Sequence, residues 1–195
     1  MKKTILFMII LAASATLVWN LYSTSTAFPD IDISTKEVSP FTYCSMKYQG
    51  SYSQFEPAIR SLMQNLQRQS VQPAGPLLGI FFNSPEDTKP QNLEWEVGFP
   101  ITPQSRVQAP LRKKQWTHTF VVTAVHVGSY ETTQETYIQM FEWMETHNLI
   151  QKGPILEKYI SMPSRGRGAG KARTEIWIPC QKPQPPSSTE INLPE

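Results

Sequence analysis

The tripeptide Gly50–Tyr52 (GSY) is written again 78 residues later as Gly128–Tyr130, and this repetition decides the fold. Further matches keep the same offset, the last one with a single residue of slippage: the Gly-Pro pairs at 75–76 and 153–154, and the segments EVGFP at 96–100 and EIWIP at 175–179. A chance match would not hold its register through so many positions. The chain therefore contains an internal duplication.

Both copies predict the same order of elements. A short strand ends at Gly-Ser-Tyr, apolar residues then recur at helical spacing, and two strands follow the Gly-Pro pair. The predicted strands are 41–48, 77–82 and 93–101 in the first copy, and 119–127, 155–161 and 174–180 in the second. One such unit is too small to bury a core, whereas two packed copies bury much more. We therefore expect an α+β fold of two tandem βαββ repeats related by a pseudo-twofold axis, with antiparallel sheets, two helices and a cleft between the repeats.

The N-terminus carries the clearest local signal. Lys2 and Lys3 precede an uncharged, largely apolar run, Thr4–Trp19, which is typical of a signal peptide or a signal-anchor helix. We assign residues 1–27 to this segment and leave cleavage and anchoring open. By the positive-inside rule the rest of the chain lies on the exported side. The expectation is a single-pass membrane protein, periplasmic if bacterial, or a secreted protein if the signal is cleaved.

Composition sets the other boundaries. Residues 28–40 are polar with two prolines and are expected to form a linker. The domain then spans residues 41–181, as repeat one (41–101), a join (102–116) and repeat two (117–181). Residues 182–195 are rich in proline and serine and are expected to be a disordered tail.

Bulk composition excludes several classes of function. A net charge of +2 over 195 residues gives no support to a nucleic-acid surface. No Cys/His cluster predicts a metal site, and no motif predicts a cofactor. The two cysteines, Cys44 and Cys180, are expected to form a disulfide if the domain is exported. Such a bond would stabilise the domain by roughly 4–5 kcal/mol in the chain-entropy model.

Taken together, the motifs resemble those of the GyrI-like, or AraC-type effector-binding, superfamily. The motifs that carry the resemblance are His126–Tyr130 (HVGSY), Tyr137, Trp143, Gly153–Pro154, Glu157–Tyr159 (EKY), Pro163, Thr174–Glu175 and Pro179 in the second half, and Gly79–Pro85 and Glu94–Pro100 in the first. The resemblance implies a tandem βαββ fold with a ligand cleft between the halves. Members of the superfamily include multidrug-sensing domains of transcription regulators, stand-alone toxin-sequestering proteins, hydrolases and membrane-tethered proteins. This chain departs from the regulators because it has an export signal and no DNA-binding helices.

Glu157 is the main candidate for a ligand-binding residue. It lies in an apolar predicted strand, and its repeat equivalent is Gly79. A carboxylate that faces an apolar groove is costly unless it is paired, so the position suits a lipophilic cation or acid catalysis. The alternative is an exposed strand glutamate that pairs with a nearby lysine or arginine. Tyr159 lies two residues on, shares its face of the strand, and can stack on a cation.

Four aromatic residues complete the predicted ligand-binding set: Phe81, Tyr48, Trp95 and Tyr137. Glu96 and Glu175 match each other across the repeat, and either a cleft or a solvent-side position suits them. The leading function is an exported or membrane-anchored domain that captures amphipathic small molecules in the cleft between the repeats, with cations as one candidate class. The alternatives are a hydrolase of a reactive small molecule that uses cleft Glu and Tyr side chains, and an envelope protein-interaction module. The sequence does not identify the ligand, a protein partner or the oligomeric state.

Overall fold

The structure is a computed structural model that describes residues 31–129, 132–161 and 171–182. The chain divides at residue 31, and every described residue belongs to the second of its two units. Among these described residues no helix has the length and apolar character needed to cross a bilayer. The expected signal segment and most of the proline-rich tail lie outside them.

The second unit has the α+β composition expected from the duplication. Its strands are β1 (Ser34–Glu37), β2 (Phe41–Gln49), β3 (Leu77–Phe81), β4 (Glu94–Pro100), β5 (Arg112–Trp116), β6 (Phe120–Val127), β7 (Ile150–Gln151), β8 (Ile155–Ser161) and β9 (Arg173–Gln181). Its α-helices are α2 (Phe55–Arg68) and α3 (Thr133–Thr146), with 3₁₀ turns at Tyr52–Gln54 and Pro90–Asn92. Repeat one supplies β2-α2-β3-β4 and repeat two supplies β6-α3-β8-β9, so the predicted βαββ order is confirmed.

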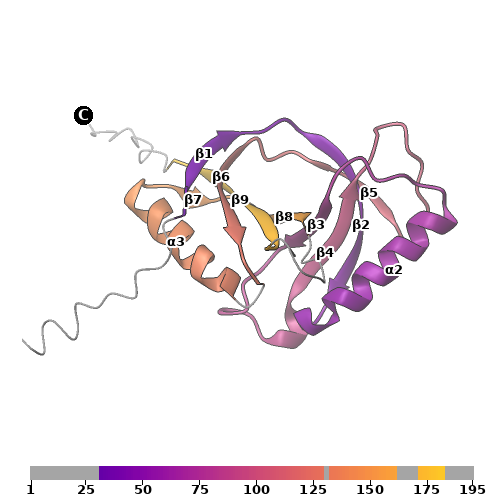
Figure 1. Ribbon diagram of the computed structural model, residues 1–195, viewed down its shortest axis with the longest axis horizontal. Coiled ribbons are helices and arrows are strands. Elements are labelled where there is room, and N and C mark those ends of the chain that lie inside the picture. Colours follow the sequence, from indigo (N-terminus) through magenta and orange to yellow (C-terminus); the bar gives the residue numbers. More distant parts are fainter. Residues whose placement is uncertain (1–30, 130–131, 162–170, 183–195) are drawn as a thin grey trace, which may run out of the picture. The chain divides into compact units, whose positions relative to one another are not determined.

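The two repeats share one antiparallel sheet, which has the strand order β1-β6-β9-β8-β3-β4-β2-β5 (Figure 1). They meet where β3 pairs with β8, and at the centre of that pairing Gly79 lies opposite its own repeat equivalent, Glu157. Leu77 pairs with Tyr159, and Phe81 pairs with Ile155, at equal distances on either side. The pseudo-twofold axis therefore passes between Gly79 and Glu157. We call this β3–β8 junction the repeat seam.

The backbone repeats in detail as well as in outline. Each α-helix ends with a left-handed residue, Ser70 at φ 52° and Asn148 at φ 53°. The next residue then donates a backbone hydrogen bond back into the helix, from Val71 to the Leu66 carbonyl and from Leu149 to the Met144 carbonyl. These pairs of residues lie 78 positions apart. The offset found in the sequence therefore holds at the level of single hydrogen bonds.

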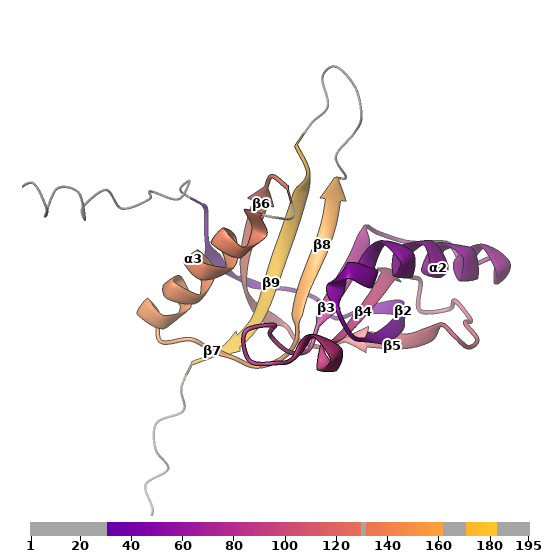
Figure 2. The ribbon, with the colours of Figure 1, turned by 90° about the horizontal axis from the view of Figure 1, so that it is seen from below.

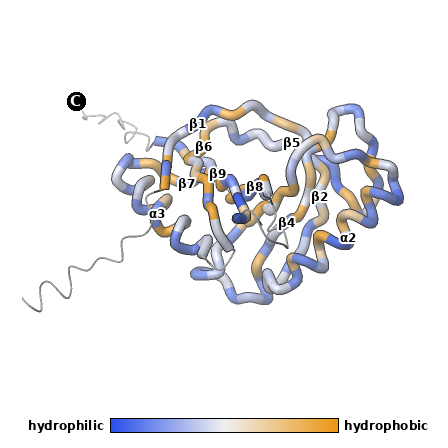
Figure 3. Tube along the Cα trace, viewed as in Figure 1, coloured by the Kyte–Doolittle hydropathy of each residue, from blue (hydrophilic) through white to orange (hydrophobic). Residues whose placement is uncertain are grey.

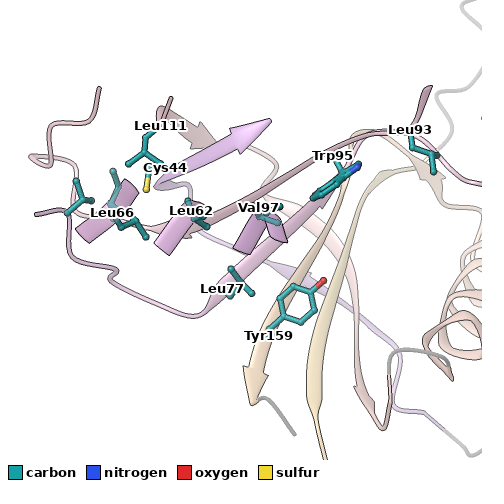
Figure 4. Close-up of a cluster of buried hydrophobic side chains, with 12 residues drawn as sticks. Cys44, Leu62, Leu66, Leu77, Leu93, Trp95, Val97, Leu111 and Tyr159 are labelled. Carbon is teal, nitrogen blue, oxygen red and sulfur yellow. The ribbon is translucent and has the colours of Figure 1, made fainter. Parts of the chain in front are cut away.

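Both α-helices lie on one face of the sheet, on either side of the repeat seam (Figures 1 and 2). Hydrophobic and hydrophilic residues alternate along α2 and α3, as expected for helices that each bury one side (Figure 3). Under α2 lies a hydrophobic cluster that includes Leu62, Leu66, Trp95 and Tyr159 (Figure 4). A second cluster lies under α3, and a third covers the opposite face of the sheet.

The structure corrects two of the expected boundaries. Part of the expected linker forms β1, which pairs with β6, and Ile31 and Ile33 pack against the cluster under α3. Part of the expected join forms β5, which pairs with β2. Both strands are short and largely polar (STKE and RKKQW), so the hydrophobic alternation that signals a half-buried strand is missing. They are the outermost strands of the sheet, where charged residues discourage edge-to-edge association.

The expected Cys44–Cys180 disulfide is also corrected, because both cysteines are free and buried. Cys44 is in β2 and Cys180 is in β9, and β4, β3 and β8 lie between those strands. Four strand spacings amount to roughly 19 Å along the sheet. A disulfide needs a Cα–Cα separation of only about 6 Å. Each cysteine instead packs in the core of its own repeat.

Candidate ligand-binding site

Glu157 lies at the centre of the repeat seam, on the side of the sheet that carries the helices. It pairs with Ile176 of β9, which packs in the cluster under α3, and paired residues point to the same side of a sheet. Its chain neighbour Leu156 belongs to the cluster on the opposite face. Only 7% of the Glu157 surface is exposed. The sequence therefore places an acidic side chain in the interior, between the two repeats.

Two tyrosine hydroxyls hold the Glu157 carboxyl group. Tyr137, from α3, donates to Oε1 at 2.5 Å, and Tyr159, from β8, donates to Oε2 at 2.5 Å. The Tyr159 contact follows from strand geometry, because residues two apart lie on the same face. The Tyr137 contact needs α3 to pack beside the seam. The structure thus brings together three of the predicted site residues, from a helix and a strand of the same repeat.

Burial raises the pKa of Glu157, since the interior disfavours the charged carboxylate. The hydrogen bonds from Tyr137 and Tyr159 and the nearby His126 oppose this rise only in part. Among the described residues no lysine or arginine forms an ion pair with Glu157. Burial and the adjacent carboxylate also hold the pKa of Tyr137 well above its ordinary value. The site thus combines a buried carboxyl group of raised pKa with two tyrosine hydroxyl donors.

Aromatic rings from repeat one extend the site away from Glu157. The ring of Phe55, on α2, lies 5.6 Å from Tyr159 and 6.2 Å from Phe81, centroid to centroid. Tyr52 packs edge-on against Phe81 at 5.3 Å. Phe81, a predicted site residue, is therefore linked to Tyr159 through Phe55. Aromatic faces of this kind attract planar and cationic ligands.

The remaining two predicted site residues, Trp95 and Tyr48, pack against each other in repeat one. Trp95 is fully buried, and its indole N–H donates to the Gly50 carbonyl at 2.9 Å. Tyr48 stacks on Trp95 at 4.8 Å. Trp95 is thus a core residue that supports Phe55, with ring centroids 5.6 Å apart, and Tyr48 is its neighbour. Sequence patterns cannot separate such a supporting ring from a ring that lines a site.

Three residues near the site were not among those predicted. Tyr52 belongs to the repeated Gly-Ser-Tyr motif, and both burial and Glu157 raise its pKa. Phe55 is one of the apolar residues that recur at helical spacing in repeat one. His126 is buried beside the start of α3, where its Nδ1 contacts the Thr136 hydroxyl at 2.8 Å and its Nε2 contacts the Ser129 carbonyl at 3.0 Å. The repetition of the Gly-Ser-Tyr motif is the signal that could have identified Tyr52.

Gly79 makes room for Tyr159 across the seam. A Cβ atom at Gly79 would lie 3.0 Å from the Tyr159 hydroxyl and 3.0 Å from the Phe81 ring. Almost any side chain here would therefore push on the hydroxyl that donates to Glu157. Because Gly79 pairs with Glu157 and has no side chain, it leaves space for the hydrogen bond from Tyr159 to Glu157.

Glu96 and Glu175 do not belong to this site. Glu96 is buried on the other face of the sheet, where it accepts hydrogen bonds from Ser45, at 2.7 Å, and from Lys114. Glu175 pairs with Lys158 at 3.1 Å and with Lys36 at 3.2 Å. Both carboxylates are thus held by lysines, unlike Glu157.

Comparison with known proteins identifies the fold. The C-terminal domain of EcmrR has a TM-score of 0.69 at 16% identity, and the match covers 78% of this chain and 99% of that one. EcmrR in its complex with DNA gives 0.71 at 16% identity, covering 93% and 69%. A hydrolase from Listeria innocua gives 0.59 at 13% identity, covering 84% and 98%. Identities this low show a shared fold only, and the curated proteins offer no match.

A family model described as the GyrI-like small molecule binding domain matches residues 31–181. The match spans both repeats and begins before β1, in agreement with the corrected N-terminal boundary. With the tandem βαββ repeats and the buried carboxyl group at their seam, it leads to one conclusion. The chain belongs to the GyrI-like family of small-molecule-binding domains.

Proposed function

We propose that this domain captures amphipathic cations at the repeat seam, with Glu157 as the anionic contact. The observation that carries the proposal is a buried carboxyl group that two tyrosine hydroxyls hold and that no described lysine or arginine neutralises. A buried carboxylate without a counter-ion is costly. A ligand cation removes that cost and gains charge-assisted contacts, so a positive ligand is favoured over a neutral one of equal size.

The aromatic rings of repeat one suit the apolar part of such a ligand. Phe55 lies next to Tyr159, Phe81 packs against Phe55, and Tyr52 packs against Phe81. These three rings offer flat surfaces to a hydrophobic body. Burial of apolar area contributes about 25 cal/mol per Å² and does not depend on a fixed orientation. A buried charge beside adaptable aromatic surface therefore favours a class of lipophilic cations over one specific compound.

A thermal-shift titration with tetraphenylphosphonium tests the proposal on the full-length protein. A ligand at 100 times its Kd stabilises the native state by about 2.7 kcal/mol, which is readily measured. Glu157→Gln keeps the size of the side chain and removes its charge, and we expect at least a tenfold loss of affinity. The matched control is Glu142→Gln, because Glu142 is an exposed glutamate on α3. Equal affinity in all three proteins, or no stabilisation of the wild type, would contradict cation capture.

A hydrolase is the second candidate, favoured by one observation: a carboxyl group of raised pKa in contact with two tyrosine hydroxyls can act as a general acid. One structural relative is described as a hydrolase, which gives a second reason to test the idea. Incubating the protein with an electrophilic probe such as an aryl epoxide, followed by mass spectrometry, separates turnover from capture. Hydrolysed product that disappears in Glu157→Gln would favour the enzyme.

We also propose that the domain is exported, either anchored by its N-terminal segment or secreted after cleavage. The support comes from the sequence alone: two lysines precede an apolar run, and no other segment of that kind occurs. A fusion of alkaline phosphatase to the C-terminus, expressed in a bacterium, tests the orientation. Phosphatase activity is expected, and an inactive, cytoplasmic fusion would refute export.

A further inference from the structure

Equivalent positions around the seam differ in polarity, and in the five pairs below the more polar residue is always in repeat two. At five matched pairs the residue of repeat one is nonpolar and that of repeat two is polar: Phe55 and Thr133, Ile59 and Tyr137, Gly79 and Glu157, Phe81 and Tyr159, Trp95 and Thr174. The pseudo-twofold axis passes between the two members of the third pair. One side of the seam is therefore nonpolar and the other side carries hydrogen-bonding groups.

Thr133 is the unexplained member of this set. It lies on the first turn of α3, four residues before Tyr137 and hence on the same helix face. It is 7% exposed, and within the part of the chain that the structure describes its hydroxyl has no hydrogen-bond partner. By contrast, the nearby Thr136 hydroxyl is satisfied by His126. A buried hydroxyl without a partner costs about 1–3 kcal/mol, so an unpaired one calls for an explanation.

The residue equivalent to Thr133 in repeat one shows what this position contacts there. Phe55 stands at this position in repeat one, and its ring contacts Tyr159 and Phe81. Threonine is much smaller than phenylalanine, so repeat two offers a hydroxyl where repeat one offers a ring. Because the two halves are related by the same offset, we expect position 133 to face the seam as position 55 does.

We propose that the Thr133 hydroxyl is a ligand contact that selects for a hydrogen-bonding group on the ligand. The inference rests on the proposed function and narrows its ligand class. The preferred ligand is an amphipathic cation that carries a hydroxyl, carbonyl or N–H group on its polar side. Its charge lies against Glu157, its polar group meets Thr133, and its apolar body lies against Phe55 and Phe81.

Matched probes test the inference on the full-length protein. Tetraphenylphosphonium has no hydrogen-bonding group, and its 2-, 3- and 4-hydroxyphenyl analogues add one hydroxyl at different reaches. For at least one isomer the wild type should bind five- to twentyfold more tightly than it binds the parent cation. Thr133→Val, which replaces the hydroxyl with a methyl group, should abolish that preference and change the affinity for the parent less than twofold.

The melting temperatures of the free proteins distinguish a ligand contact from a structural role. Thr133→Val should melt at or above the wild-type temperature, because no hydrogen bond is lost. The matched control, Thr136→Val, loses the bond to His126 and should melt lower. A fall in Thr133→Val as large as that in Thr136→Val would overturn the inference, as would a hydroxyl preference that survives Thr133→Val or is absent for all three isomers. If tetraphenylphosphonium still binds in a Glu157-dependent way, only this inference fails and the proposed function stands.

Discussion

The two repeats have nearly the same backbone, but they contribute differently to the hydrophobic core and to the candidate site. In repeat one, α2 buries Ala58, Leu62 and Leu66, and Trp95 anchors a continuous aromatic core. In repeat two, α3 buries two threonines among its four buried residues, and its side of the seam holds the carboxyl group. Duplication doubles the core and leaves two copies of each position at the seam. One copy is then free to exchange packing for polar contacts while the other maintains stability.

The largest expected effect concerns the contribution of each repeat to the free energy of unfolding. Trp95→Ala should lower the free energy of unfolding by about 3–5 kcal/mol, because it opens a large cavity and removes the bond to Gly50. Thr174→Val, at the equivalent position of repeat two, should cost less than about 1 kcal/mol. Urea denaturation of both variants measures the difference. Similar losses in the two variants would show that both repeats carry stability equally.

A smaller effect, on ligand affinity, is expected from the polar groups that repeat two places at the seam. Tyr137→Phe removes one of the two hydroxyls that donate to Glu157, at a position where repeat one has Ile59. The ionised carboxylate loses a stabilising contact, so its pKa should rise further and the affinity for tetraphenylphosphonium at pH 7 should fall about three- to tenfold. Ile59→Val is the matched control and should leave the affinity within twofold. Isothermal titration calorimetry measures both variants, and an unchanged Tyr137→Phe affinity would remove Tyr137 from the site.

Much of the fold follows from the sequence because the duplication supplies an internal check. For the six predicted strands, the starts and ends agree with the observed ones within one residue, since the two copies supply the same pattern at the same offset. β1 and β5 escaped prediction because they are polar edge strands without an apolar period. The disulfide was wrong because the order of strands in the sheet, which separates Cys44 from Cys180, is a long-range property.

The site was predictable in part. Glu157 was predicted because it is a glutamate in an apolar strand and its repeat equivalent is Gly79. Tyr159 was predicted because it lies two residues further along the same strand and shares the face of Glu157. Thr133 and His126 gave no such signal, because a threonine at the start of a helix and a histidine near the end of a strand are common. Their significance depends on whether a buried polar atom has a partner, and that follows only from packing.

The dependence of cation affinity on pH tests the central claim most directly. Burial raises the pKa of Glu157, and only the ionised carboxylate offers a negative charge. The affinity of the wild type for tetraphenylphosphonium, a permanent cation, should therefore be highest above that raised pKa and fall as the pH drops through it. Calorimetric titrations over a series of pH values should show this slope in the wild type and a flat profile in Glu157→Gln. A wild-type profile as flat as that of Glu157→Gln, or the same slope in both proteins, would contradict the assignment of Glu157 as the anionic contact.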